Sequence, residues 1–198
     1  YNNSKGAFIN ETPFGNEKEA TISIVARDIN LDGYVDLILA NRNKQPNRIY
    51  YGPSFSSSSI FGSGNDETRQ VAIGDMNGDG DPDIVAVNIG EKNNIIYNDG
   101  RGNFKKSVPF GSSSDRSMSV ALGDLDGDGD LDIVIGNSGS KNHYYINNNL
   151  KFRLNHFSEN DKITYGITLG DLNNDGTLDI IESNSGDVNK IFFNKTQE

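Results

Sequence analysis

Four acidic loops recur along the chain with one spacing of oxygen-bearing residues, D-x-[ND]-x-D-G-x-x-D. They begin at Asp28, Asp75, Asp124 and Asp171. Calcium takes roughly six to eight oxygen ligands, and a short loop wraps it when alternate side chains point inward. Positions 1, 3, 5 and 9 would supply side-chain oxygens and position 7 a backbone carbonyl, while Gly at position 6 allows the sharp turn. The spacing therefore predicts about four calcium sites, one in each loop.

The predicted ligands follow from this register. They are Asp28, Asn30, Asp32, Tyr34 (carbonyl) and Asp36; Asp75, Asn77, Asp79, Asp81 (carbonyl) and Asp83; Asp124, Asp126, Asp128, Asp130 (carbonyl) and Asp132; and Asp171, Asn173, Asp175, Thr177 (carbonyl) and Asp179. Magnesium is the weaker candidate, because it prefers a smaller octahedral shell that retains several waters.

Two other interpretations of the loops were weighed. An EF-hand requires Glu at position 12, where these loops carry Leu39, Ala86, Ile135 and Glu182. Asp-Gly loops are also common as plain hairpin turns. Four loops in register, each with at least three carboxylates, favour a metal, because carboxylates so close repel one another unless a cation compensates them.

The loops belong to a unit that repeats four times, since the first aspartates are 47, 49 and 47 residues apart. Each unit predicts four short strands: an alternating strand before the loop (21–26, 117–122), an apolar strand after it (84–87, 133–135), an aromatic and aliphatic strand (49–51, 95–97, 144–146, 191–193), and a strand bounded by two Phe (8–14, 55–61, 104–110, 152–157). Four strands at this period are typical of β-propeller blades. The predicted fold is an all-β propeller, a single domain over residues 1–198, with units at about 8–54, 55–103, 104–151, and 152–198 plus 1–7.

The ends of the chain suggest how the ring closes. Residues 1–8 align with 97–104, so the chain opens with the last strand of a blade and ends after the third strand of another. We expect the N-terminal strand to complete the last of four blades. The alternatives are half of an eight-bladed ring, formed by two chains that exchange strands, or part of a larger propeller.

The Phe-Gly pairs at 14–15, 61–62 and 110–111, each followed by strand, loop and strand, resemble FG-GAP/VCBS repeats. These repeats form the calcium-bearing blades of integrin α-subunit propellers and occur in many secreted proteins and some lectins. The resemblance covers essentially the whole chain, although Ser158 replaces Gly in the fourth pair and Arg27 replaces the Gly before the first Asp. It implies rings of about seven or eight blades, structural calcium and an extracellular or cell-surface location.

Composition narrows the function. The chain has no Cys, which excludes thiolate metal sites and Cys nucleophiles, and a net charge of −10 argues against nucleic acid. No apolar run is long enough for membrane insertion. Neither His143 nor His156 lies in a nucleophile motif, so we expect no catalytic activity.

Repeat-matched Asn and Tyr residues are the candidate ligand contacts: Asn41, Asn88, Asn137 and Asn184, with Asn47, Asn93, Asn142 and Asn189, and with Tyr50, Tyr51, Tyr97, Tyr144 and Tyr145. They would bind sugars in equivalent pockets, unless the Asn residues serve the turns between strands. The sequence thus predicts a secreted calcium-binding module for carbohydrate or a protein surface. A structural or adhesion scaffold and an accessory domain of a polysaccharide-degrading enzyme are the alternatives.

Overall fold

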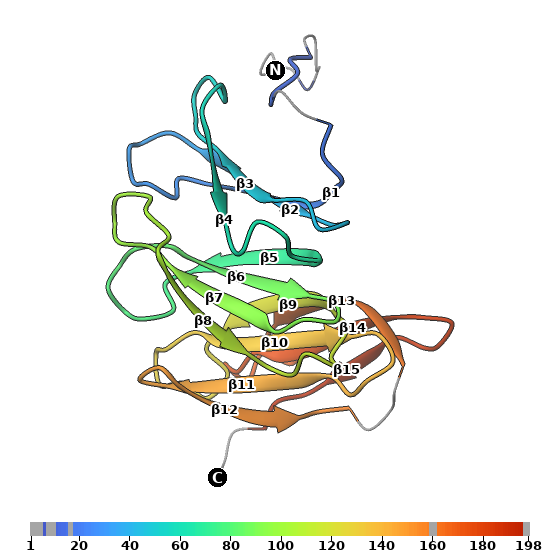
Figure 1. The fold of residues 1–198 in the computed structure, drawn as a ribbon. Helices are drawn as coiled ribbons and strands as arrows, with labels where there is room; N and C mark the ends of the chain where they lie inside the picture. The colour runs from blue at the N-terminus through green and yellow to red at the C-terminus, as the bar shows by residue number, and fades with distance from the viewer. Residues whose placement is uncertain (1–5, 7–10, 16–17, 159–161, 196–198) are drawn as a thin grey trace.

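The computed structural model describes residues 6, 11–15, 18–158 and 162–195, and all regular structure in them is β-strand (Figure 1). None of these residues belongs to a helix that could cross a membrane. The first sheet contains β1 (Thr21–Arg27), β2 (Asp36–Asn41), β3 (Asn47–Tyr50) and β4 (Ser58–Phe61), and the second β5 (Thr68–Gly74), β6 (Asp83–Asn88), β7 (Asn93–Tyr97) and β8 (Lys106–Phe110). The third contains β9 (Ser117–Gly123), β10 (Asp132–Asn137), β11 (His143–Asn148) and β12 (Lys151–His156), and the fourth β13 (Ile163–Gly170), β14 (Asp179–Ser185) and β15 (Lys190–Phe192).

Each sheet is an antiparallel meander in which strands pair in sequence order. The sheets stack face to face, and the first strands of successive sheets contact one another (Figure 1). The second strands of the inner sheets, β6 and β10, are buried at every residue, because a neighbouring sheet packs on each of their faces. This explains why their sequences are continuous apolar runs rather than alternating ones.

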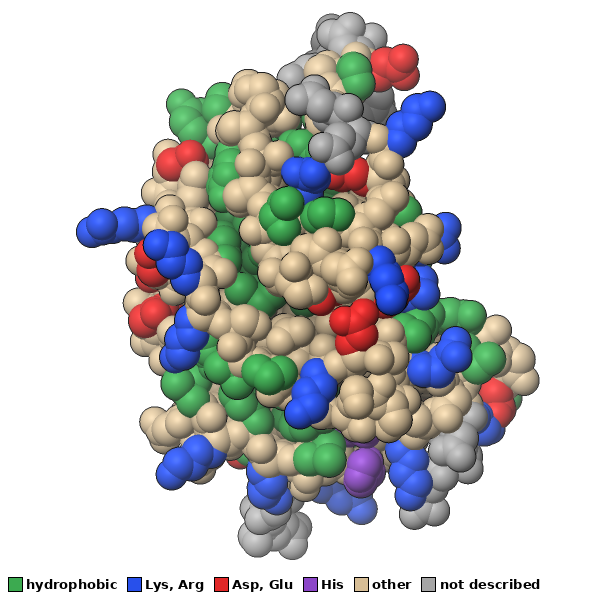
Figure 2. Space-filling model, viewed as in Figure 1, with side chains coloured by type: hydrophobic (Ala, Val, Ile, Leu, Met, Phe, Trp, Pro, Cys, Tyr) green, Lys and Arg blue, Asp and Glu red, His purple; other side chains and the backbone are tan. Residues whose placement is uncertain are grey.

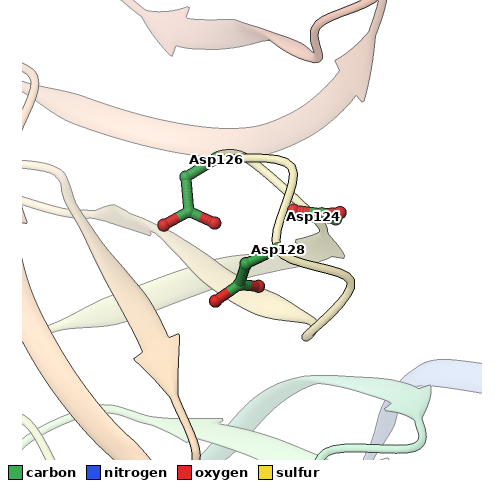
Figure 3. Close-up of side chains that lie close together, drawn as sticks. All are labelled: Asp124, Asp126 and Asp128. Carbon is green, nitrogen blue, oxygen red and sulfur yellow. The ribbon is translucent and has the colours of Figure 1, made fainter.

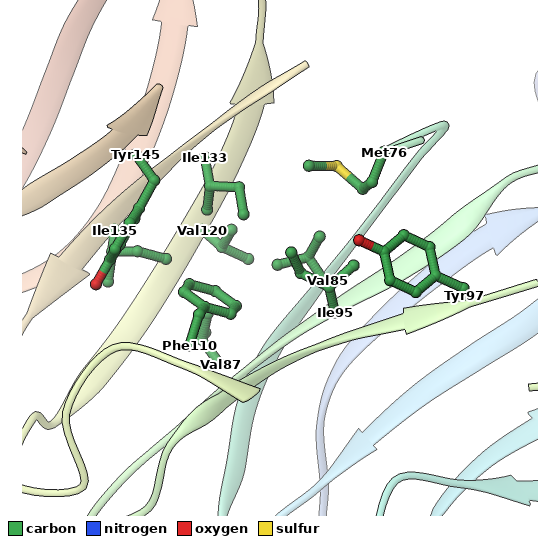
Figure 4. Packing of buried hydrophobic residues seen from close by; sticks show 10 residues of the cluster. All are labelled: Met76, Val85, Val87, Ile95, Tyr97, Phe110, Val120, Ile133, Ile135 and Tyr145. Carbon is green, nitrogen blue, oxygen red and sulfur yellow. The ribbon is translucent and has the colours of Figure 1, made fainter. Parts of the chain in front are cut away.

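The hydrophobic core is divided among the junctions between sheets. One cluster joins the first and second sheets and includes Ile38, Ile49 and Ile84. The next joins the second and third sheets and includes Val85, Ile133 and Tyr145 (Figure 4). A smaller cluster, Val134, Ile167 and Ile180, joins the third and fourth sheets.

Close packing between successive loops explains the Gly that precedes the first Asp. A Cβ on Gly74 would lie 2.6 Å from Leu131 Cδ1, and a Cβ on Gly123 would lie 2.7 Å from Leu178 Cδ1. Each Leu is the eighth residue of the following loop. In the first sheet Arg27 replaces the Gly, and the facing loop has Pro82 at this position.

The predicted all-β class is confirmed, and the described residues form three four-stranded sheets and one of three strands. The ring predicted from four blades is not closed. The sheet of β1 and the sheet of β13 lie at opposite ends of the stack, so the alternative of part of a larger propeller fits (Figure 1). The predicted strand at 8–14, which was expected to complete the last blade, lies largely outside the described residues.

Candidate calcium sites

Each acidic loop connects the first and second strands of a sheet. Position 1 follows the first strand, and position 9 begins the second strand at Asp36, Asp83, Asp132 and Asp179. The Gly at position 6 has φ near +90° in all four loops, a left-handed conformation that disfavours other residues. Asp-Gly therefore sets the turn that brings the oxygens of positions 1, 3 and 5 to one side.

Backbone amides shape the loop around the first and fifth positions. In the second loop Asp75 Oδ2 accepts a hydrogen bond of 2.8 Å from Gly80 N, and Asp79 Oδ1 accepts one of 2.9 Å from Asp81 N. The other three loops repeat both bonds. Because the second bond uses the N–H of position 7, the carbonyl that we predicted as a ligand belongs to a residue already fixed to position 5.

The third loop brings three carboxylates together. One carboxylate oxygen from each of Asp124, Asp126 and Asp128 lies within 4.8 Å of the others (Figure 3). Two ligands of one calcium ion, each roughly 2.3–2.6 Å from it, are at most about 5 Å apart. Three hard oxygens at this separation fit calcium, and three negative charges so close call for a cation.

The other three loops have Asn at position 3, and this changes the contacts. Asn30, Asn77 and Asn173 each donate from Nδ2 to the Asp at position 5, at 3.0, 2.8 and 2.8 Å. This hydrogen bond offsets part of the negative charge of the Asp at position 5, which a cation would otherwise compensate. To bind calcium these Asn must present Oδ1 instead, so the four loops predicted as equivalent sites differ in their starting geometry.

The Asp at position 9 is fully buried in every loop. Asp83 accepts hydrogen bonds from Met76 N at 3.0 Å and Asn98 N at 2.8 Å, one on each carboxylate oxygen. Asp36, Asp132 and Asp179 repeat this pattern. Burial raises the pKa of Asp83 and of Asp132 to about 6, although both backbone hydrogen bonds lower it. The predicted ligand is thus also the residue that ties the loop to the end of the third strand.

An Asn at the end of the third strand donates a hydrogen bond to the acidic loop of the preceding sheet, a role that we did not predict. Asn98 Nδ2 donates to Ile29 O at 2.7 Å, and Asn194 Nδ2 donates to Leu125 O at 2.7 Å. Asn147 makes the equivalent bond to Met76 O at 3.2 Å. The sequence does carry a signal for this role, because Asn recurs at this position in three units. The first unit has Gly52 there.

The Asn residues predicted as possible sugar contacts form hydrogen-bond networks within the sheets, which are buried in the first three sheets. In the second sheet Asn88 accepts from Thr68 Oγ1 at 2.9 Å, and its backbone N–H donates to Asn93 Oδ1 at 2.9 Å. Asn93 Nδ2 then donates to Ser117 Oγ of the third sheet at 3.0 Å. Matching bonds serve Asn41, Asn47, Asn137, Asn142, Asn184 and Asn189 within their sheets. Asn41, Asn88 and Asn137 are at most 1% exposed, so the structure favours the turn-supporting role.

The Tyr residues named with them are also engaged in packing. Tyr50, Tyr97 and Tyr145 are each 5% exposed, and Tyr144 is half-buried against Phe157. Burial raises the pKa of Tyr145 to about 12. The described residues therefore do not assemble these Asn and Tyr side chains into an open pocket.

The two His residues face each other across β11 and β12. His143 is buried and His156 is exposed, and their Nδ1 atoms are 3.3 Å apart. His143 Nε2 also lies 3.0 Å from Asn137 Nδ2 and 3.4 Å from Asp115 Oδ2. Burial lowers the pKa of His143, and Asp115 partly offsets this.

Sequence comparison identifies the repeat. An FG-GAP-like repeat matches residues 28–86, 75–135 and 124–182, which together span most of the chain. This chain belongs to the FG-GAP-like repeat family. Each FG-GAP-like match starts at the first Asp of one loop and ends in the strand directly after the next loop. It therefore includes two acidic loops. The comparison with curated proteins gives no match.

Three solved structures resemble the fold of these FG-GAP-like repeats. BBS1N, in a complex with ARL6DN, has a TM-score of 0.56 at 12% identity over 93% of this chain and 59% of that chain. The Vibrio cholerae biofilm matrix protein Bap1 has a TM-score of 0.51 at 24% identity, over 83% and 28% of the two chains. The Photorhabdus luminescens Tc holotoxin pore has a TM-score of 0.48 at 21% identity, over 80% and 8%. This chain spans less than two thirds of each of them, and these likenesses show the fold alone.

Proposed function

We propose that this chain is a calcium-stabilised, extracellular adhesion module without catalytic activity. The observation that carries the proposal is the set of three carboxylates, Asp124, Asp126 and Asp128, with oxygens within 4.8 Å of one another in one of the four repeated loops. When bound, calcium would supply a positive charge that links the first, third and fifth positions of each loop. Loops fixed in this way would present a stable surface to a partner.

The same loops account for the acidity of the chain. Four calcium ions would offset most of the net charge of −10. In the face shown in Figure 2, Lys and Arg are spread widely, while Asp and Glu occur singly or in small groups. A calcium-loaded surface of mixed charge suits adhesion to a protein or matrix polymer, which is the partner class that we propose. The location of Bap1 in a biofilm matrix agrees with this proposal.

A small-sugar pocket is a weaker form of the proposal, because the Asn and Tyr residues that suggested it are largely buried. The test is a paired binding experiment with the whole chain in calcium and in chelator. Capture of extracellular proteins or matrix polymer in calcium, lost in chelator and restored by added calcium, is expected. Binding that ignores calcium would contradict the proposal, and turnover of a polysaccharide by the chain would contradict its non-catalytic part. Selective binding on a glycan array would restore the sugar-pocket alternative.

A further inference from the structure

The outward face of the first sheet is apolar where the equivalent residues of the other sheets are buried. Ile24 lies four residues before the first Asp and is 52% exposed. Its counterparts Val71, Val120 and Ile167 are 1%, 3% and 8% exposed, because the preceding sheet covers them. The first sheet therefore has a contact face for a preceding sheet that the described residues do not supply.

The outward face of the fourth sheet shows the complementary pattern. Ile191 in β15 is 50% exposed, whereas the equivalent residues Ile49 and Ile95 are fully buried by the sheet that follows. Leu172, at position 2 of the fourth loop, is 47% exposed, whereas Ile29 at the same position of the first loop is fully buried. This face is built to receive a following sheet.

Two pairs of positions at the ends match contacts made inside the stack. Gly74 faces Leu131, and Gly123 faces Leu178, of the following loop. A Cβ on the next Gly of this series, Gly170, would lie 4.0 Å from Leu172 Cδ2 of its own loop, and apart from its two chain neighbours no other described residue would be as near. Val35, which occupies the Leu position of the first loop, is 54% exposed. Gly170 and Val35 are thus the two halves of a fourth contact of the same kind.

Hydrogen bonds also join successive sheets, and the same positions recur at the two ends of the stack, as a donor in the fourth sheet and an acceptor in the first. Asn47 donates to Thr68 at 2.8 Å, and Asn142 donates to Thr164 at 2.9 Å. The equivalent donor in the fourth sheet is Asn189, which is exposed, with no following sheet in the described residues. The equivalent acceptor in the first sheet is Thr21.

Phe14 already occupies the first sheet as if it came from a preceding sheet. Phe110, which ends the fourth strand of the second sheet, packs edge-on against Tyr145 of the third sheet at 5.2 Å between centroids. Phe14 packs edge-on against Tyr50 of the first sheet at 5.5 Å. Tyr50 and Tyr145 hold the same register, opposite Leu37 and Ile133. Phe14 therefore takes the same place against the first sheet that Phe110, from the preceding sheet, takes against the third.

In the described residues the fourth sheet ends at β15, an edge strand with no fourth strand paired to it, and a cavity lies beside this edge. A cavity of about 820 Å³ lies between the third and fourth sheets, lined by Tyr144, Ile146, Phe192 and the third loop among others. At the two earlier junctions Phe104, two residues before β8, and Phe152 of β12 pack against the core. The cavity lies at the corresponding place of the third junction, where the described residues supply no fourth strand.

We propose that the fourth sheet of one copy docks on the first sheet of a second copy of this chain, in the geometry of the three internal junctions. The second copy would place Phe14 and the chain next to it at the free edge of β15, a form of β-augmentation. Such a contact is heterologous, and two of them close a ring of two copies.

The first experiment measures the mass of the whole chain in solution by light scattering at micromolar concentrations. We expect a species of two copies for the wild type. Ile24→Glu blocks the first sheet and Ile191→Glu blocks the fourth, and each should give one copy. Val108→Glu, a substitution of an exposed residue on the outer strand β8, is the matched control and should keep the mass of two copies. Unchanged circular dichroism would show that each variant is folded, and a wild type of one copy would overturn the proposal.

The second experiment tests the direction of the contact. An equimolar mixture of Ile24→Glu and Ile191→Glu retains one intact fourth sheet and one intact first sheet, so a species of two copies should reappear. If the mixture stays at the mass of one copy, the head-to-tail geometry is wrong.

Discussion

Asn147 donates from its side chain to the backbone carbonyl of Met76 at 3.2 Å, and from its backbone N–H to Asp132 at 2.8 Å. Met76 in turn donates its own N–H to Asp83. One residue therefore links an acidic loop of the second sheet, through its side chain, to the buried aspartate of the third, through its backbone. The loops are fixed from both sides before any cation binds.

Asn147→Ala should lower the free energy of unfolding by about 1–3 kcal/mol, because it leaves two buried carbonyls, of Met76 and Leu131, without this donor. Chemical denaturation measures the loss. Asn148→Ala, at an exposed neighbouring position, is the control and should change stability little. Equal effects of the two variants would contradict the role given to Asn147.

Exchanging the third residue between two loops should have opposite effects with and without calcium. Asp126→Asn supplies an amide that can donate to Asp128, as Asn77 donates to Asp79, and removes a like charge. It should stabilise the chain in chelator and weaken calcium binding. Asn77→Asp should do the reverse at the second loop. Thermal melts in both buffers, with calorimetric titration, check this, and a shift of the same sign for both variants would be evidence against it.

Removal of calcium should lower the melting temperature. A ligand that binds only the folded state stabilises it by about 2.7 kcal/mol per site at one hundred times its dissociation constant. Magnesium should restore less of the loss, since it prefers a smaller shell with bound water. Melting that is the same in chelator and in calcium would rule out structural calcium.

Asn93→Ala should destabilise the chain by about 1–3 kcal/mol, because Asn93 is buried and bridges Asn88 to Ser117 of the next sheet. Asn94→Ala is a suitable control, because the side chain of Asn94 is only partly buried and its hydrogen bonds are exposed. Denaturation curves of the two variants measure the difference. An Asn93 variant of normal stability would return this residue to the list of candidate ligand contacts.

The pH dependence of stability should depend on His143. Burial lowers its pKa in the folded state below the ordinary 6.5, although Asp115 raises it, so the unfolded chain binds more protons in this range. Stability should therefore fall as the pH drops through 6.5. In His143→Asn, which places the residue of the equivalent position Asn94, this part of the slope should vanish. Asp83 and Asp132 titrate near pH 6 in both proteins, so the difference between the two denaturation series isolates His143. Parallel curves would contradict this prediction.

Local pattern was enough to predict the strands and the loops. The interval between Asp28, Asp75, Asp124 and Asp171 and the Phe pairs mark a unit whose hydrogen bonds lie within the unit. The sequence left two roles open for Asn88 and Asn93, sugar contact or support of the turns, because their hydrogen-bond network includes Ser117, which lies in another unit. A repeat pattern shows that a position matters in every unit, but not whether its side chain points outward or toward the neighbouring sheet.

Closure of the ring was the other point that local pattern did not determine. It depends on the rotation between successive sheets, which arises from packing across the junctions, such as the contact of Gly74 with Leu131.

The differences among the loops had a clear signal in the sequence, since the other three loops have Asn at the position of Asp126. The consequence, an amide that donates to the neighbouring carboxylate, required the side-chain geometry.

The division of the core into separate junction clusters has a consequence for how the chain folds. The main contacts of the strands are within their own sheet or with the sheet next to it in sequence, so non-adjacent sheets need not meet. Folding can then begin at any junction and spread to its neighbours, in the manner of a one-dimensional array. The third junction has the smallest cluster, and hydrogen exchange should therefore be fastest in β13–β15, where opening of the native state would begin.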